Sequence, residues 1–151
     1  MLPDRRALCL AAAAGLAGCG GPPLVGVRTP TVAGIDWSLI ELDGRPVERA
    51  LRPDGTPAPS PTLRLDGNAG RAQGSTGLNT FTGSYQQTGS TLTFGPLAST
   101  RRAGPPPAMA LESALLKALE ATASAQVDDD GLALLDEQAR VRARFAPGPR
   151  P

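Results

Sequence analysis

The chain has 151 residues, a length typical of one domain, and 40% of its residues are hydrophobic but only 3% are aromatic. Its 15 basic and 14 acidic residues give a net charge of +1, so no overall field attracts nucleic acid. Histidine is absent, which removes the commonest general base, metal ligand and pH switch.

Residues 1–18 are expected to be a lipoprotein signal peptide. Arg5 and Arg6 precede the apolar run Ala7–Ala17, which is shorter than the about 20 residues that span a bilayer. The run ends in Leu16-Ala17-Gly18-Cys19, which resembles the lipobox of bacterial lipoproteins, where the cysteine thiol receives diacylglycerol. The alternative is an ordinary signal peptide with an incidental cysteine, but position, spacing and flanks favour lipidation.

The mature chain would then begin at Cys19 and be held in the membrane by its acyl chains. Gly20 follows in place of aspartate, which favours the cell outer membrane, with the domain facing the periplasm. Because Cys9 leaves with the signal and the lipid occupies the sulfur of Cys19, no thiol remains for a disulfide. Residues 19–34 are rich in glycine and proline and are expected to form a flexible tether, with an edge strand over Leu24–Val27 as the alternative.

The folded domain is expected over residues 35–146. Ile35–Leu42 alternates apolar and polar residues, which predicts a half-buried strand with Trp37 facing the core. Arg45–Pro61 is rich in proline and predicts a long exposed loop. Further strands are predicted at Thr62–Leu65, at Gly70–Gly74, and in a hairpin of Thr82–Gln87 and Thr91–Phe94.

Two stretches are expected to form fixed corners between strands, Gly77–Tyr85 and Ser99–Gly104. One helix follows the second corner. Pro105–Pro107 fixes its entry and Met109–Thr122 continues it, with one apolar stripe that predicts packing on a sheet. A membrane-surface helix is disfavoured because Lys117 is the only cation on the polar face. The stripe consists of Ala108, Leu111, Leu115, Leu116, Ala118 and Leu119.

The C-terminal part returns to strands at Ala125–Val127 and Gly131–Leu135, joined by a turn at the aspartates 128–130. Arg140–Phe145 alternates strictly and puts its arginines on one face. We expect a solvated face that discourages pairing between sheet edges. A site for an anionic lipid or polymer is the alternative. Residues 147–151 are expected to be a disordered tail.

Taken together, these motifs resemble the META domain of the HslJ-like family over about residues 35–146. The resemblance implies an α+β fold, in which a curved antiparallel sheet forms a partial barrel packed on one main helix, similar to that of secretin pilot lipoproteins. Members of the family are often envelope lipoproteins with links to heat shock and antibiotic tolerance, and they have no established catalytic activity. The central motif residues are Gly77, Asn79, Phe81, Gly83, Tyr85, Thr100 and Arg101.

The sequence departs from the family at one pair of positions. Members commonly carry cysteine at the positions of Leu78 and Gly104, and here both are missing. We expect the Leu78 side chain to fill the space of the sulfur atoms, and the prolines 105–107 to stiffen the second corner. The same absence argues against a redox role.

No catalytic residue, metal site or cofactor is expected. Asn79 is expected to cap its own turn, and Arg101 to cover the helix or pair with an acid, with ligand contact by Arg101 left open. A dyad of serine and Lys117 is disfavoured because Lys117 is expected on the polar side of the helix. Calcium at the aspartates 128–130 is disfavoured because a complete calcium loop needs further oxygen ligands at defined steps, and these are absent. The acids that could form a glycosidase pair are expected to be solvated charges: Glu112, Glu120, Asp136 and Glu137.

The sequence therefore predicts a lipid-anchored, non-enzymatic envelope lipoprotein with a binding or assembly role in envelope stress tolerance. A half-open barrel mouth would receive an acyl chain, a peptide or a partner protein. The alternatives are a cell-wall hydrolase or sugar-modifying enzyme, and a purely structural outer-membrane lipoprotein without a ligand.

Overall fold

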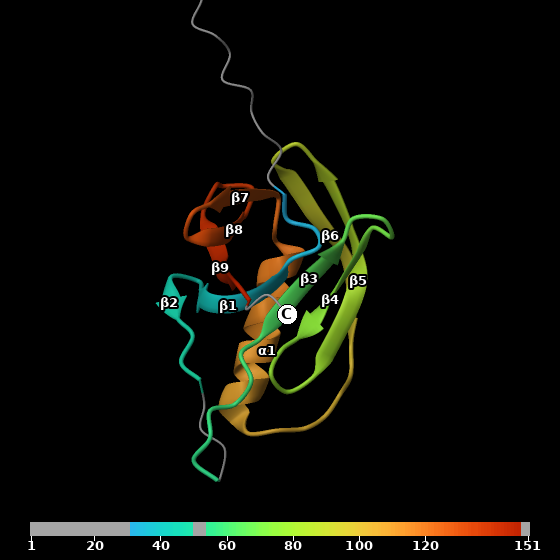
Figure 1. Cartoon of the computed structure of the whole chain (residues 1–151). Coiled ribbons are helices and arrows are strands. Elements are labelled where there is room, and N and C mark those ends of the chain that lie inside the picture. Colours follow the sequence, from blue (N-terminus) through green and yellow to red (C-terminus); the bar gives the residue numbers. More distant parts are fainter. Residues whose placement is uncertain (1–30, 50–53, 149–151) are drawn as a thin grey trace, which may run out of the picture.

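A computed structural model describes residues 31–49 and 54–148 (Figure 1). The predicted signal peptide, Cys19, most of the predicted tether and the last residues of the predicted tail lie outside this part. Within it, no helix is long and apolar enough to cross a membrane. The elements are β1 (Asp36–Leu42), β2 (Arg45–Pro46), β3 (Thr62–Asp66), β4 (Arg71–Ser75), β5 (Thr80–Thr88), β6 (Thr91–Ser99), α1 (Pro106–Glu120), β7 (Ser124–Asp128), β8 (Gly131–Leu135) and β9 (Val141–Pro147).

The strands form one antiparallel sheet of nine strands that bends round on itself. Strand β1 pairs with β3 on one side and with β9 on the other, so the two ends of the strand order meet. The pairing between neighbouring strands is shortest between β6 and β7, where Thr91 and Ser124 form the single paired position. Helix α1 packs against β6, β9 and β1 (Figure 1). The predicted α+β class, a curved antiparallel sheet packed on one main helix, is confirmed.

The helix buries the stripe that the sequence predicts. Leu115, Ala118 and Leu119 are buried, and Leu111 and Leu116 pack partly against the core. The helix begins at Pro106, earlier than Met109, because proline fits a first turn where its missing N–H costs no hydrogen bond.

The core contains four of the few aromatic side chains, Trp37, Phe81, Tyr85 and Phe145. It begins earlier in the chain than the expected start at Ile35. Val32 is completely buried, and its carbonyl accepts a 2.8 Å hydrogen bond from the Trp37 indole. This bond satisfies a donor that would otherwise be buried without a partner, which is why residues before Ile35 pack on the domain.

Two differences concern strand lengths. Strand β6 continues through Pro96 to Ser99, well beyond the predicted end at Phe94. The register shifts between Gly83 and Tyr85, and this irregularity accommodates a proline inside a strand. The expected loop at Arg45–Pro61 opens with strand β2, which pairs with β1.

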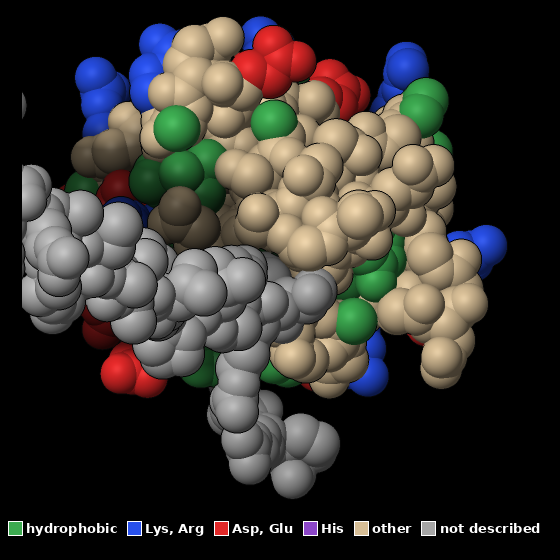
Figure 2. Space-filling model, turned by 90° about the horizontal axis from the view of Figure 1, so that it is seen from above, with side chains coloured by type: hydrophobic (Ala, Val, Ile, Leu, Met, Phe, Trp, Pro, Cys, Tyr) green, Lys and Arg blue, Asp and Glu red, His purple; other side chains and the backbone are tan. Residues whose placement is uncertain are grey.

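The surface carries charges of both signs. Seen from above, basic and acidic side chains are interspersed around the visible face (Figure 2). This distribution agrees with the balanced composition and gives no face of a single sign in this view.

Candidate functional site

The turn between β4 and β5 contains the start of the predicted motif. Gly77 has a φ of +87°, which favours glycine. The Thr76 hydroxyl accepts a 2.9 Å hydrogen bond from the Asn79 backbone N–H, and the Thr76 N–H donates to the Asn79 carbonyl at 2.8 Å. The prediction that the Asn79 side chain caps this turn is therefore wrong, because Thr76 does so.

The Asn79 side chain instead joins three segments. It is buried, and its Oδ1 accepts hydrogen bonds from the Thr100 hydroxyl at 2.9 Å and from the Arg102 N–H at 2.8 Å. Its Nδ2 donates to the Arg102 carbonyl at 3.2 Å and to Glu112 Oε2 at 2.7 Å. Since an amide group offers two donors and two acceptor positions, its capacity is used completely. Asn79 thereby ties the second corner to helix α1.

Glu112 is the acidic member of this network. Its Oε2 accepts from Asn79 and lies 3.1 Å from the Thr76 hydroxyl, which can donate to it. The side chain is half-buried, so the expectation of a solvated charge is wrong here. A charged acceptor strengthens these hydrogen bonds. We call Thr76, Asn79, Thr100, Arg102 and Glu112 the corner network.

Leu78 and Gly104 lie side by side next to the corner network. A Cβ atom placed on Gly104 would come within 2.6 Å of Leu78 Cδ1 and 3.3 Å of its Cγ. Leu78 is half-buried, so its side chain fills the space at Gly104 as expected while part of it remains accessible. The two corners therefore touch at the two positions for which the family resemblance implied a cysteine pair.

Three other motif residues, Phe81, Gly83 and Tyr85, contribute to the packing of the sheet. Phe81 and Tyr85 are buried in the core. Burial, with the nearby charge of Asp66, raises the pKa of the Tyr85 hydroxyl. Gly83 lies inside β5 and forms no corner, contrary to expectation. A Cβ there would meet the backbone carbonyl oxygen of Pro96 at 2.8 Å, so this position needs glycine for close packing against β6.

A cleft lies between the second corner and helix α1, and we call it the helix cleft. It encloses ≈ 420 Å³, and a larger groove of ≈ 690 Å³ lies on the sheet.

 Arg101 lines the cleft together with residues of helix α1, and among the described residues it forms no ion pair. Of its two expected roles, covering the helix or pairing with an acid, the second is therefore not found. The lining residues are Asn79, Arg101, Arg102, Ala103, Met109, Glu112, Ser113 and Leu116.

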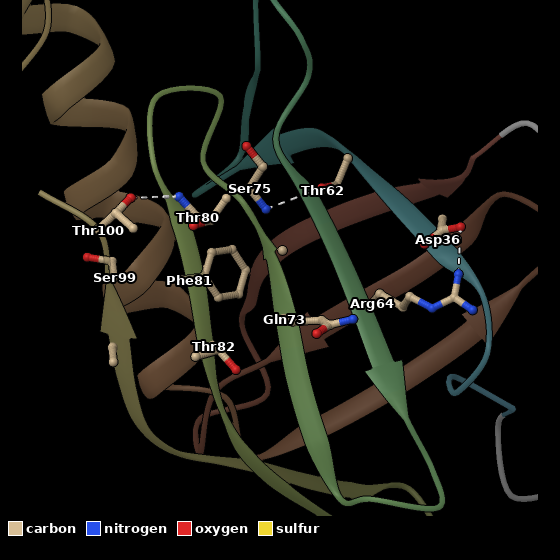
Figure 3. Close-up of a pocket in the computed structure, with 12 residues that line it drawn as sticks. Asp36, Thr62, Arg64, Gln73, Ser75, Thr80, Phe81, Thr82, Ser99 and Thr100 are labelled. Atoms are coloured by element: carbon tan, nitrogen blue, oxygen red, sulfur yellow. Dashed lines mark hydrogen bonds and ion pairs between the residues drawn. The ribbon is translucent and has the colours of Figure 1, made fainter. Parts of the chain in front are cut away.

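The larger groove runs over the outer face of β3 to β6, and we call it the strand groove (Figure 3). Its lining is mainly hydroxyl and amide side chains, with the Arg64–Asp36 ion pair of 2.8 Å at one end. Thr100 belongs to both the strand groove and the corner network, and its hydroxyl donates a hydrogen bond to Asn79 Oδ1. The hydroxyl and amide members are Thr62, Gln73, Ser75, Thr80, Thr82, Ser99 and Thr100.

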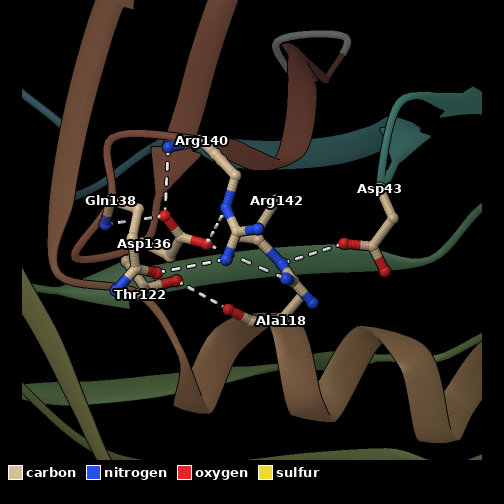
Figure 4. A network of polar contacts seen from close by, with 7 residues as sticks. All are labelled: Asp43, Ala118, Thr122, Asp136, Gln138, Arg140 and Arg142. Atoms are coloured by element: carbon tan, nitrogen blue, oxygen red, sulfur yellow. Dashed lines mark hydrogen bonds and ion pairs between the residues drawn. The ribbon is translucent and has the colours of Figure 1, made fainter.

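The arginines near the C-terminus are not edge charges, contrary to the expectation from the sequence. Strand β9 lies between β8 and β1, so it has no free edge there. Arg142 Nε lies 2.9 Å from Asp43, and Arg140 Nε lies 3.1 Å from Asp136 (Figure 4). These cations are held by carboxylates, which disfavours the alternative of an anion site at this face.

Asp136 is buried at the centre of that cluster, so the expectation of a solvated charge is wrong for it as well. Burial opposes ionisation, but the backbone N–H groups of Arg140 and Gln138 and the Arg140 guanidinium outweigh it and lower the pKa of Asp136. The role of Asp136 is therefore to hold the loop before β9.

The aspartates 128–130 form a turn between β7 and β8. Asp128 Oδ1 accepts hydrogen bonds from the N–H groups of Asp130 at 3.0 Å and Gly131 at 3.1 Å. Over the described ranges, no cluster of three or more potential metal ligands occurs.

The META domain family matches residues 30–148 of the chain. A solved protein from Burkholderia xenovorans is similar over 99% of this chain and 100% of its own, with 24% identity and a TM-score of 0.60. A DUF4847 family protein from Bacteroides vulgatus is similar over 80% of this chain and 97% of its own, with 18% identity and a TM-score of 0.57. Both likenesses concern the fold alone. No curated protein matches the chain.

Proposed function

The chain belongs to the META domain family, and from this premise we propose that it is a lipid-anchored, non-enzymatic envelope protein whose domain binds a ligand or partner at the helix cleft. Cys19 would carry the anchor, and the domain would face the periplasm from the outer membrane. The role would be binding or assembly in support of envelope stress tolerance.

One observation carries the binding role. The polar groups of the motif are engaged in holding the corner, since Asn79 uses its full capacity and Thr100 donates to it. Glu112 accepts the Asn79 amide, which leaves this acid in a supporting position. The groups of the helix cleft that a ligand can reach are arginine side chains and apolar surface. Such groups are suited to binding a ligand rather than to transferring a proton.

The position of the site differs from the barrel mouth that the sequence suggested. The interior is filled by core side chains, among them Trp37, Leu63 and Phe145. An occupant would therefore lie beside the helix, at the surface of the domain.

The anchor is tested by membrane fractionation. The full chain and a Cys19→Ser variant are expressed in a bacterium with an outer membrane, and Cys9→Ser provides the matched control because it changes the other cysteine of the chain. The unchanged chain and Cys9→Ser are expected in the outer membrane, and Cys19→Ser outside it. Equal distribution of all three chains would contradict the proposal.

A further inference from the structure

The second corner presents two neighbouring cations at the helix cleft. Arg101 and Arg102 are exposed, and within residues 31–49 and 54–148 neither forms an ion pair. Their backbone is fixed, because Asn79 binds both the N–H and the carbonyl of Arg102. The ordering cost of this loop is thus met before any ligand arrives, which favours affinity.

Apolar side chains form the other part of the cleft. Met109 is 50% exposed, although it is a large hydrophobic residue, and Leu116 packs partly against the core. Residues 109 and 116 are two turns apart on α1, so they extend the apolar surface along the helix.

The charge of the cleft selects the sign of a ligand. Of the lining residues Glu112 alone is acidic, and its Oε2 already receives the Asn79 amide. The arginines therefore leave an excess of positive charge, and a guanidinium matches carboxylate and phosphate oxygens in geometry.

We propose that the helix cleft binds a single-chain anionic amphiphile, with its carboxylate or phosphate at Arg101 and Arg102 and its apolar chain along Met109 and Leu116. This inference rests on the proposed binding function and names its ligand class. The shared chemistry is an anionic head on an aliphatic chain, and the test separates a fatty carboxylate from an alkyl phosphate.

The chain offers a specific reporter for this test. It has two methionines, Met1 and Met109, so methyl labelling with carbon-13 gives one signal from the cleft. The full chain carrying Cys19→Ser is titrated with octanoate and, separately, with octyl phosphate. Octanol and octylammonium serve as neutral and cationic controls with the same chain length.

The Met109 methyl signal is expected to shift saturably with at least one anionic probe and not with octanol or octylammonium. Response to octanoate alone indicates a fatty carboxylate, and response to octyl phosphate alone indicates an alkyl phosphate. Replacing both arginines in Arg101→Gln/Arg102→Gln should weaken binding roughly tenfold or more, since a charged hydrogen bond is lost. Arg71→Gln, which changes an exposed arginine of β4 outside the cleft, should bind as before.

Two results would overturn the inference: a Met109 signal that no anionic probe moves, or binding that the double variant retains at full strength. Either result leaves the Cys19 fractionation experiment unaffected, so failure of the ligand class and failure of the anchor can be told apart.

Discussion

Replacing Asn79 by aspartate tests the corner network with almost no change in shape. The substitution removes the Nδ2 donor to Glu112 at 2.7 Å and to the Arg102 carbonyl at 3.2 Å, and it places two carboxylates against each other. A charged and a neutral hydrogen bond are lost, which costs about 3 kcal/mol before any repulsion. For a domain of this length we expect a melting temperature roughly 10 °C lower near neutral pH.

The pH dependence gives the stricter test. Two carboxylates this close raise the pKa of one of them above its unfolded value, so the destabilisation is complete above the raised pKa and shrinks as the pH falls through it. Thermal melts followed by circular dichroism between about pH 4.5 and 7.5 should show Asn79→Asp approaching the wild type in acid. Adding Glu112→Gln restores a donor and should recover much of the loss near neutral pH. A variant that melts with the wild type at neutral pH, or whose deficit ignores pH, would refute the reasoning.

Two further predictions concern the packing of the corners and the arginine cluster. Leu78→Ser should lower the melting temperature by several degrees, because about 1–2 kcal/mol of apolar contact with Gly104 is lost, and an unchanged value would contradict the packing role. Leu78→Cys/Gly104→Cys should form a disulfide that raises the melting temperature of the oxidised over the reduced protein, with about 3.5 kcal/mol as the chain-entropy estimate, and failure to oxidise would refute the proximity of the two positions. Asp136→Asn should destabilise the domain near neutral pH, and this deficit should vanish in strong acid. The pKa of Asp136 is lowered in the folded domain, so the ionised carboxylate stabilises the fold above the ordinary value of 3.8, and this stabilisation is lost as the pH falls through the lowered pKa. A deficit of Asp136→Asn that persists in strong acid would contradict this reasoning.

Local patterns predicted the elements well because their signals are local. Alternation around Trp37 and the apolar stripe of α1 each indicate which face is buried. The same reasoning located the helix within a few residues, since prolines mark its entry. The bend of the sheet followed from the family resemblance, not from periodicity.

The roles of polar residues could not be predicted in this way. Asn79 and Glu112 are 33 positions apart, and only the folded chain brings them to 2.7 Å. The arginines of β9 suggested an edge strand, because alternation along one strand does not reveal which strands pair with it. In the structure β9 pairs with both β1 and β8.

The most direct test of the account is the intact mass of the protein extracted from its native membrane. We predict a chain that begins at Cys19 and carries a diacylglyceryl group with further acylation, as a lipid-anchored binding domain requires. A chain that begins elsewhere, or that has an unmodified Cys19, would contradict it.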